Sequence, residues 1–209
     1  MKEAKDIDDS LEFLRSFEKH ANETELGELV LQKLDLHCRS LNLQGSRLTE
    51  SDFKKLFSIE PLKHLQLMDL GETGMTSKGI KHLCVSKWLK CLGILSLSNN
   101  NLDDEGIFFL SKTTCLPSLT ALDLSSNEVG ALGVKALSLS TSLSNLDSLN
   151  LSYNRIEPLG IHALANSTFG QQLKTLKLCD TCLGNEGVEA LARHSLKELE
   201  FVDLSENSI

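Results

Sequence analysis

The sequence contains few aromatic residues, few prolines and little positive charge. Aromatic residues make up 5% of the 209 positions and there are three prolines, which disfavours β-barrels and sandwiches, whose cores rely on aromatic and β-branched side chains. The chain has 21 Lys and Arg against 29 Asp and Glu, a net charge of −8. This balance disfavours binding to nucleic acid or to an anionic membrane surface. No apolar run is long enough to insert into a membrane, and the charged segment Met1–Ser10 does not resemble a secretion signal.

Recognisable catalytic and metal-binding motifs are also missing. The sequence has no GxGxxG, GxxxxGK[ST], GxSxG or HExxH segment, and its six histidines lack the spacing of metal ligands. The pair Cys179 and Cys182 forms a single CxxC in a turn, which we interpret as structural. We therefore expect no enzyme activity, no cofactor and no metal. The six cysteines are expected to be reduced thiols in the cytoplasm.

The dominant feature of the sequence is an internal repeat. LGILSLSNNNL from Leu92, LTALDLSSNEV from Leu119 and LDSLNLSYNRI from Leu146 all fit LxxLxLxxNxL, and weaker copies lie on both sides. The fourth position of each copy recurs every 27 residues, with a last interval of 26, at Leu41, Met68, Leu95, Leu122, Leu149, Leu176 and Val202. A fixed period of this length is typical of a solenoid.

A second signal repeats between these segments: glycine, an apolar residue, two variable residues and leucine, as in Gly106-Ile107…Leu110. The spacing predicts one apolar face of a short helix. Thr76, Asp103 and Asn185 are candidate helix caps, and Pro158 fits a first helical turn. The recurring glycine indicates that each helix start lies close to a neighbouring backbone.

Each unit is thus predicted to be a strand, a turn, a helix and a return loop. Stacked units share one core, with a parallel sheet on the inner curve and helices on the outer curve. Asn100, Asn127, Asn154 and Asn207 follow the strands, where their amides can bond turn backbone between repeats, and Ser46, Thr73 and Thr181 can replace them in part.

These motifs resemble the leucine-rich repeat superfamily, and specifically its ribonuclease-inhibitor-like subclass with helical outer segments. The resemblance covers residues 38–209 and implies an α/β solenoid, or horseshoe, of seven repeats, the last incomplete. A second resemblance, to leucine-rich repeat effectors that bacterial pathogens deliver into host cells, is based on the small size, the absence of a signal peptide and the absence of another domain.

The two ends of the chain differ from the repeats. Residues 1–37 are predicted to form a helical N-terminal cap, with helices near Ser10–His20 and Glu25–Leu36, and they carry five basic and ten acidic residues. An acidic interaction arm is the alternative. The sequence stops at Ile209, the eleventh position of the seventh repeat, so we expect either that the natural chain continues or that something covers this end.

Binding is expected on the inner face, where the variable residues beside the strand leucines point to solvent. Leu67, Ile94 and Ala121 form an apolar row with Asp69, Glu72 and Asp123 beside it, and Tyr153 is the only tyrosine. This composition suits a protein partner with a basic contact surface, although a solvated acidic face would look similar. The candidate partner-binding residues are Leu67, Asp69, Glu72, Ile94, Ser96, Ala121, Asp123, Asn150, Tyr153 and Lys177.

The function predicted from these features is a non-catalytic scaffold that binds another protein through its concave face. The resemblance to bacterial effectors implies a host protein as the partner and the host cytoplasm as the location. Two alternatives stay open: a regulator resembling GTPase activators of this subclass, and a sensing or autoinhibitory repeat domain of a larger receptor. Binding of nucleic acid and insertion into a membrane are not expected.

Overall fold

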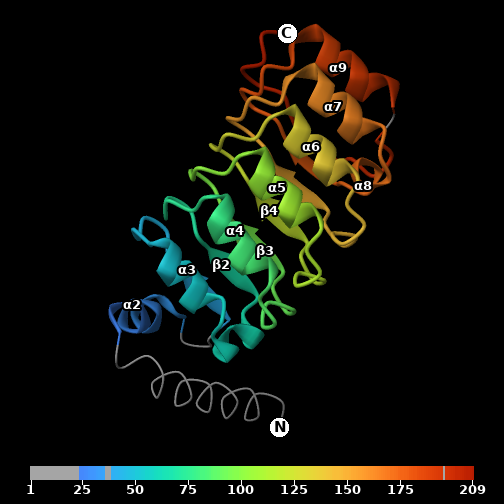
Figure 1. The fold of residues 1–209 in the computed structure, drawn as a ribbon. Coiled ribbons are helices and arrows are strands. Elements are labelled where there is room, and N and C mark those ends of the chain that lie inside the picture. The colour runs from blue at the N-terminus through green and yellow to red at the C-terminus, as the bar shows by residue number, and fades with distance from the viewer. Residues whose placement is uncertain (1–23, 36–38, 195) are drawn as a thin grey trace.

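The computed structural model describes residues 24–35, 39–194 and 196–209 and consists of stacked strand–helix units (Figure 1). The strands, each of three residues, are β1 (Ser40–Asn42), β2 (Leu67–Asp69), β3 (Ile94–Ser96), β4 (Ala121–Asp123), β5 (Ser148–Asn150), β6 (Thr175–Lys177) and β7 (Phe201–Asp203). The helices are α2 (Glu25–Lys33), α3 (Glu50–Leu56), α4 (Ser77–Cys84), α5 (Asp104–Ser111), α6 (Ala131–Ser138), α7 (Glu157–Ala165), α8 (Thr168–Gln171) and α9 (Gly184–Arg193), with the 3-10 helix η1 (Glu60–His64) before β2.

The strands form one parallel sheet whose order follows the sequence from β1 to β7. Its register pairs the positions predicted to be equivalent, so that Leu95 lies beside Leu122 and Leu122 beside Leu149. All three are buried. The helices cover one side of the sheet, and the other side is left open (Figure 1). The predicted α/β leucine-rich repeat solenoid is confirmed.

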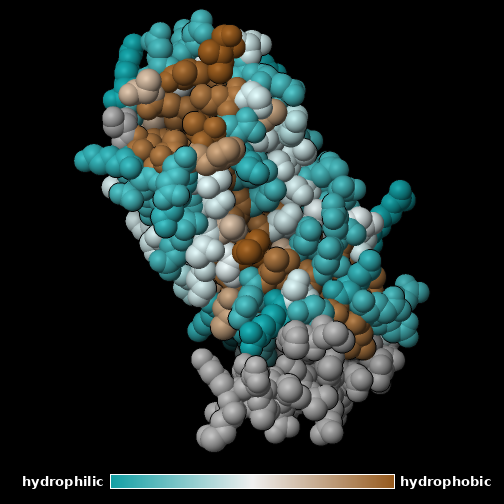
Figure 2. Space-filling view, turned by 180° about the vertical axis from the view of Figure 1, so that it is seen from behind, coloured by the Kyte–Doolittle hydropathy of each residue, from teal (hydrophilic) through white to brown (hydrophobic). Residues whose placement is uncertain are grey.

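The core lies between the sheet and the helices. The second leucine of each strand motif is completely buried from Leu43 to Leu178, and the helices contribute apolar residues such as Ile80, Leu110 and Leu137. At the last strand the pattern weakens because no further repeat follows in the structure: Val202 is 39% exposed, and Phe201 and Ile209 are also exposed. A large apolar area covers this end of the molecule in Figure 2.

A ladder of asparagines joins each turn to the preceding repeat. In Asn154, Oδ1 accepts a hydrogen bond from the Val129 N–H at 2.9 Å, and Nδ2 donates to the carbonyls of Leu124, at 2.9 Å, and Leu151, at 3.0 Å. Asn100, Asn127 and Asn207 make the equivalent bonds. Thr73 and Thr181 replace asparagine in part, because each hydroxyl donates to the carbonyl three residues earlier, directly after the strand. The predicted role is confirmed for the four asparagines and the two threonines, whereas at Ser46 the bond to the Leu43 carbonyl comes from the backbone N–H.

Two of the repeated glycines lie where a helix start comes close to the backbone of the preceding helix. A Cβ on Gly106 would lie 3.4 Å from the Ser77 Cα, and a Cβ on Gly160 would lie 3.2 Å from the Ala131 Cα. Such distances leave little room for any side chain. The predicted close approach to a neighbouring backbone is therefore confirmed for these two helix starts.

The predicted helix starts are confirmed only in part. Asp103 caps α5 by accepting from the Gly106 N–H at 3.1 Å, and Pro158 lies in the first turn of α7. Thr76 occupies the cap position of α4 but makes no side-chain cap bond. The cap predicted at Asn185 is wrong because α9 already begins at Gly184, directly after the helical Leu183.

The described part of the N-terminal region is the single helix α2. Thr24 caps it at the Gly27 N–H, and Leu26 and Val30 pack into the core. The helix ends at Lys33, earlier than the predicted Leu36, because Leu34 is extended and forms an antiparallel bridge with Leu41. The helix predicted near residues 10–20 lies outside the described residues. The domain boundary at residue 37 stays a prediction.

Leu122→Ala is expected to lower the free energy of unfolding by about 2–5 kcal/mol, because it opens a cavity in a core that cannot collapse freely. Leu122 is only 2% exposed, whereas Leu159, on the outer surface of α7, is 66% exposed. Leu159→Ala is the matched control, with a loss below about 0.5 kcal/mol. Chemical denaturation measures both. A loss under about 1 kcal/mol for Leu122→Ala would contradict its burial.

Asn154→Ala is expected to cost about 3 kcal/mol, because it leaves the buried Val129 N–H and Leu124 carbonyl without their partner. Asn166→Ala, at an exposed helix end, is the control and should be close to neutral. Equal effects of the two substitutions on the urea midpoint would show that the asparagine ladder contributes nothing specific.

Candidate partner-binding surface

The open side of the sheet presents three parallel rows of side chains, which we call the first, middle and rim rows. Strand register aligns them across all seven strands. The first row contains Ser40, Leu67, Ile94, Ala121, Ser148, Thr175 and Phe201. The middle row contains Asn42, Asp69, Ser96, Asp123, Asn150, Lys177 and Asp203. The rim row follows three residues later and contains Gly45, Glu72, Asn99, Ser126, Tyr153, Asp180 and Glu206.

All ten residues predicted from the sequence lie in these rows, so the fold brings them onto one surface. In the first row, Leu67, Ile94 and Ala121 are neighbours on β2, β3 and β4. Ile94 is 46% exposed and the other two are half-buried. Figure 2, seen from the side opposite the helices, shows a narrow apolar strip in the middle of the molecule between hydrophilic areas. An exposed isoleucine in this setting can anchor a partner.

The middle row has a structural role that sequence reasoning missed. In five of its residues, Oδ1 accepts a hydrogen bond from the backbone N–H two residues later, which closes the turn after the strand. The donor–acceptor distances are 2.9 Å for Asn42, 2.9 Å for Asp69, 2.8 Å for Asp123, 3.1 Å for Asn150 and 3.0 Å for Asp203. The signal was present as the recurrence of Asp or Asn at this position.

Asp123 is the most strongly engaged residue of the middle row. Its Oδ1 also accepts from the Ser125 hydroxyl at 2.6 Å, and its Oδ2 accepts from Asn150 Nδ2 at 3.1 Å. Both carboxylate oxygens therefore have protein partners. A substitution at Asp123 would disturb the turn as well as the surface, so this residue is a poor probe of binding.

The rim row stands out because of its backbone. Its six residues other than glycine all have a left-handed conformation with φ between 49° and 59°. Five of the six, all but Glu206 in the last unit, donate their N–H to a carbonyl of the next repeat, as Tyr153 does to Cys179 at 2.7 Å and Glu72 to Ser98 at 3.0 Å. These bonds continue the ladder beyond the strands and hold the rim side chains outward in a fixed row. None of the six is β-branched, as this conformation requires.

Tyr153 is half-exposed at the rim beside acidic neighbours. A hydrogen bond with the Cys179 side chain, together with the negative charges of Glu206 and Asp180, raises the pKa of Tyr153 above its usual value. The phenol therefore stays protonated at neutral pH. A rigidly held aromatic ring with a polar end is a common interface anchor.

The charge on the three rows is almost entirely negative. Six carboxylates belong to them: Asp69, Glu72, Asp123, Asp180, Asp203 and Glu206. Lys177 is the single basic residue in the rows, and it is exposed. The surface therefore complements a partner with positive charge.

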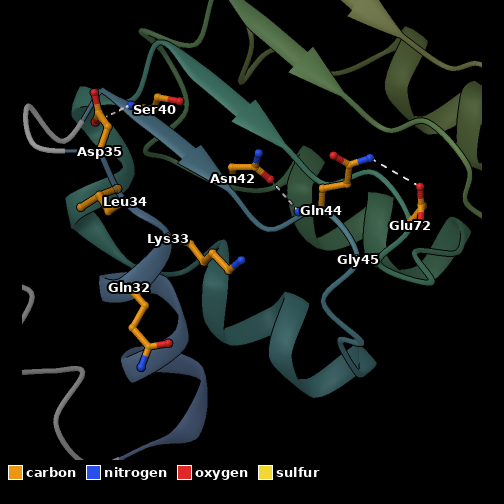
Figure 3. A pocket seen from close by; sticks show the side chains of 9 residues that line it. All are labelled: Gln32, Lys33, Leu34, Asp35, Ser40, Asn42, Gln44, Gly45 and Glu72. Atoms are coloured by element: carbon orange, nitrogen blue, oxygen red, sulfur yellow. Dashed lines mark hydrogen bonds between the residues drawn. The ribbon is translucent and has the colours of Figure 1, made fainter.

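A polar cavity of about 640 Å³ lies at the N-terminal end of the same face (Figure 3). Lys33 and Asp35, at and beyond the end of α2, form one side, and Asn42, Gln44 and Glu72 form the other. Gln44 Nε2 donates to Glu72 Oε1 at 3.4 Å. The sequence could not reveal this cavity, because it depends on how α2 packs beside β1.

The described residues also give the arrangement of possible metal ligands and of the cysteine thiols. Over this part of the chain, no three His, Cys, Asp or Glu side chains are grouped to hold a metal ion. In the CxxC segment Cys179 is buried and Cys182 is exposed in a turn, which fits its structural interpretation. Burial raises the pKa of Cys84 to about 12 and also raises that of Cys115, so these thiols are poor nucleophiles at neutral pH. Among the described helices, none has the length and apolarity to cross a bilayer.

Comparison with known proteins supports the fold at the level of the family. The family profile described as "Leucine Rich repeat" matches four consecutive segments, at residues 89–111, 115–138, 142–165 and 171–192. The sequence matches none of the curated proteins with which it was compared. The four matched segments are therefore leucine-rich repeats, and they lie within a stack of seven units of the same design.

Solved structures with a similar fold include a TLR13–ssRNA13 complex, at a TM-score of 0.50 and 19% identity over 88% of this chain. The match covers 24% of that protein, so this chain spans about a quarter of its length. Leiomodin-1 actin-binding site 2 matches with a TM-score of 0.47 and 15% identity, over 82% of this chain and 90% of that one. The tropomodulin C-terminal domain of Caenorhabditis elegans matches with a TM-score of 0.42 and 17% identity, over 81% of this chain and 90% of that one. At such identities the first likeness shows a shared fold and nothing further.

Asp203 offers a test of the turn bonds in the middle row. Hydrogen bonds from the side chain and the backbone N–H of Ser205 lower the pKa of Asp203 below 3.8. A carboxylate whose pKa is lower in the folded than in the unfolded state stabilises the fold at pH values above its unfolded-state pKa. This stabilisation is lost as the pH falls through the folded-state pKa. Ser205→Ala should therefore raise the pKa of Asp203 toward 3.8, as measured by NMR titration.

The control for this titration is Asp52, whose lowered pKa depends on Thr49 and should not respond to Ser205→Ala. An Asp203 that titrates at or above 3.8 in the unsubstituted chain would show that the turn bond is absent in solution.

Proposed function

We propose that this chain is a non-catalytic scaffold that binds another protein, one with a basic contact surface, through the three rows of its open sheet face. The observation that carries the proposal is the combination on one rigid sheet of an exposed apolar centre, an outward tyrosine and six carboxylates against one lysine. The ladder of backbone bonds fixes the rows before binding, which lowers the entropy that association must overcome.

Binding of nucleic acid is disfavoured by the same charges. One structural neighbour is a complex with single-stranded RNA. Recognition of a phosphate backbone needs clustered lysine and arginine, whereas these rows present carboxylates beside Tyr153 and Lys177. We therefore include in the proposal that the partner is a protein.

The subclass, the cellular compartment and the biological role also belong to the proposal, and fewer observations support them. The helical outer segments and the 27-residue period support the ribonuclease-inhibitor-like subclass. The five described cysteines are free, which supports a reducing compartment such as the cytoplasm. The bacterial effector role and the two alternatives, a GTPase activator and a receptor domain, depend on resemblance alone and stay predictions.

The proposal predicts that substitutions on the open face weaken binding without loss of fold. Ile94→Asp removes the apolar anchor and Tyr153→Ala removes the aromatic anchor, so each should lower the affinity for the partner by about tenfold or more. The partner would be captured by the immobilised chain, identified by mass spectrometry and titrated by calorimetry against each variant.

The matched control is Leu159→Asp, which places the same charge on an exposed apolar residue of the helical side. It should leave the affinity unchanged. If both open-face variants bind as tightly as the unsubstituted chain while Leu159→Asp does not, the binding surface lies among the helices and the proposal is wrong.

A further inference from the structure

We propose that the partner presents an amphipathic helix with one basic flank, whose apolar residues dock on the first row at β2, β3 and β4 and whose last turns extend over β5 and β6. This inference depends on the proposed function, because it specifies what docks on the same surface. It follows from the spacing of the apolar row, from the distribution of charge on its two sides and from the position of Tyr153.

The spacing of the apolar row matches the repeat of a helix. Leu67, Ile94 and Ala121 lie on adjacent strands, which are about 4.8 Å apart in a sheet. A helix that crosses the strands presents one apolar residue per turn, about every 5.4 Å, and a modest tilt of its axis removes the difference. An extended segment repeats a face about every 6.6 Å, so its third side chain would miss the row by more than 3 Å.

Charge is distributed unequally on the two sides of this row. On the side toward the strand ends lie Asp69, Glu72 and Asp123. The positions before the row on the same strands are uncharged: Gln66, Gly93 and Thr120. A helix about 10 Å wide that lies on the row reaches the middle row on one side. Its basic residues should therefore lie on a single flank, and that flank sets the direction in which the helix binds.

The end of the surface sets the length of the helix. Beyond Ala121 the first row becomes polar at Ser148 and Thr175, while Tyr153 and Asp180 occupy the rim. From β2 to β6 there are four strand intervals, or about 19 Å, which corresponds to about 13 helical residues. A lysine or arginine on the basic flank of the last turns would extend over the middle row toward Tyr153, whose protonated hydroxyl and acidic neighbours suit it.

Three synthetic peptides of about 14 residues test the inference directly with the full chain. The first has leucines at i, i+4 and i+7 and lysines at i+1, i+5 and i+8, which places the charges on one flank of a helix. The second has the same composition with leucines at every second position. The third keeps the helical pattern but has glutamate instead of lysine. A single-stranded RNA of matched length is the fourth probe.

The expected result, from fluorescence anisotropy, is that the first peptide binds about tenfold more tightly than each of the other probes and gains helical circular dichroism on binding. Ile94→Asp should weaken it about tenfold, and the outer-surface control Leu159→Asp should not. If the alternating peptide binds as tightly as the first peptide, the inference that the partner presents a helix is wrong. If the RNA binds more tightly than the first peptide and Ile94→Asp abolishes that binding, the proposal that the partner is a protein is wrong.

A charge exchange tests the basic flank without disturbing the apolar row. Glu72 is exposed at the rim, and the hydrogen bond that its carboxylate accepts from Gln44 is long, at 3.4 Å. Glu72→Lys should lower the affinity for the lysine peptide and raise the affinity for the glutamate peptide, each by about threefold. Loss of binding to both peptides, or no change in either, would contradict the assigned flank. Thermal unfolding of each variant checks that the fold is kept.

Failure of this inference can be told apart from failure of the proposed function. If the natural partner loses affinity for Ile94→Asp but the helical peptide does not bind, the open face is the binding surface and the helix is wrong. If neither the partner nor the peptide responds to Ile94→Asp or Tyr153→Ala, the proposed function itself is wrong.

Discussion

A strand of three residues cannot bury its own leucines, and every other feature of this molecule depends on how that problem is solved. Each inner strand pairs in the same register on both sides, so that equivalent leucines meet in one core. The polar backbone groups of the turns after the strands would be costly to bury without partners, and the asparagine ladder supplies these partners. Among the described residues, no buried side-chain nitrogen or oxygen lacks a hydrogen-bond partner either.

The same solution produces the surface. Since leucines occupy alternate strand positions, the residues between them must face solvent. The rim residues extend this surface because left-handed turns direct them outward while their N–H groups bond to the next repeat. The stability of the solenoid and the rigidity of the open face are therefore two effects of one hydrogen-bond pattern.

This coupling limits what the surface residues can do. Asp69 and Asp123 face the open side, but they also close the turns, so their presence is explained in part by the fold. Ile94, Glu72 and Tyr153 have no comparable side-chain role in the described turns. Their character is therefore better evidence for recognition than that of the aspartates. The apolar strip with acid on one side is the feature that the fold itself does not require.

The sequence by itself determined the repeat, its register and the location of the surface, because a period of 27 residues leaves one way to align the strand leucines. Tertiary structure alone decided the hydrogen-bond partners of the middle row, the left-handed rim and the cavity beside α2. It also placed the start of α9 one residue before the predicted cap at Asn185. These features depend on contacts between residues of different repeats, or between α2 and β1, whose distances no local pattern contains.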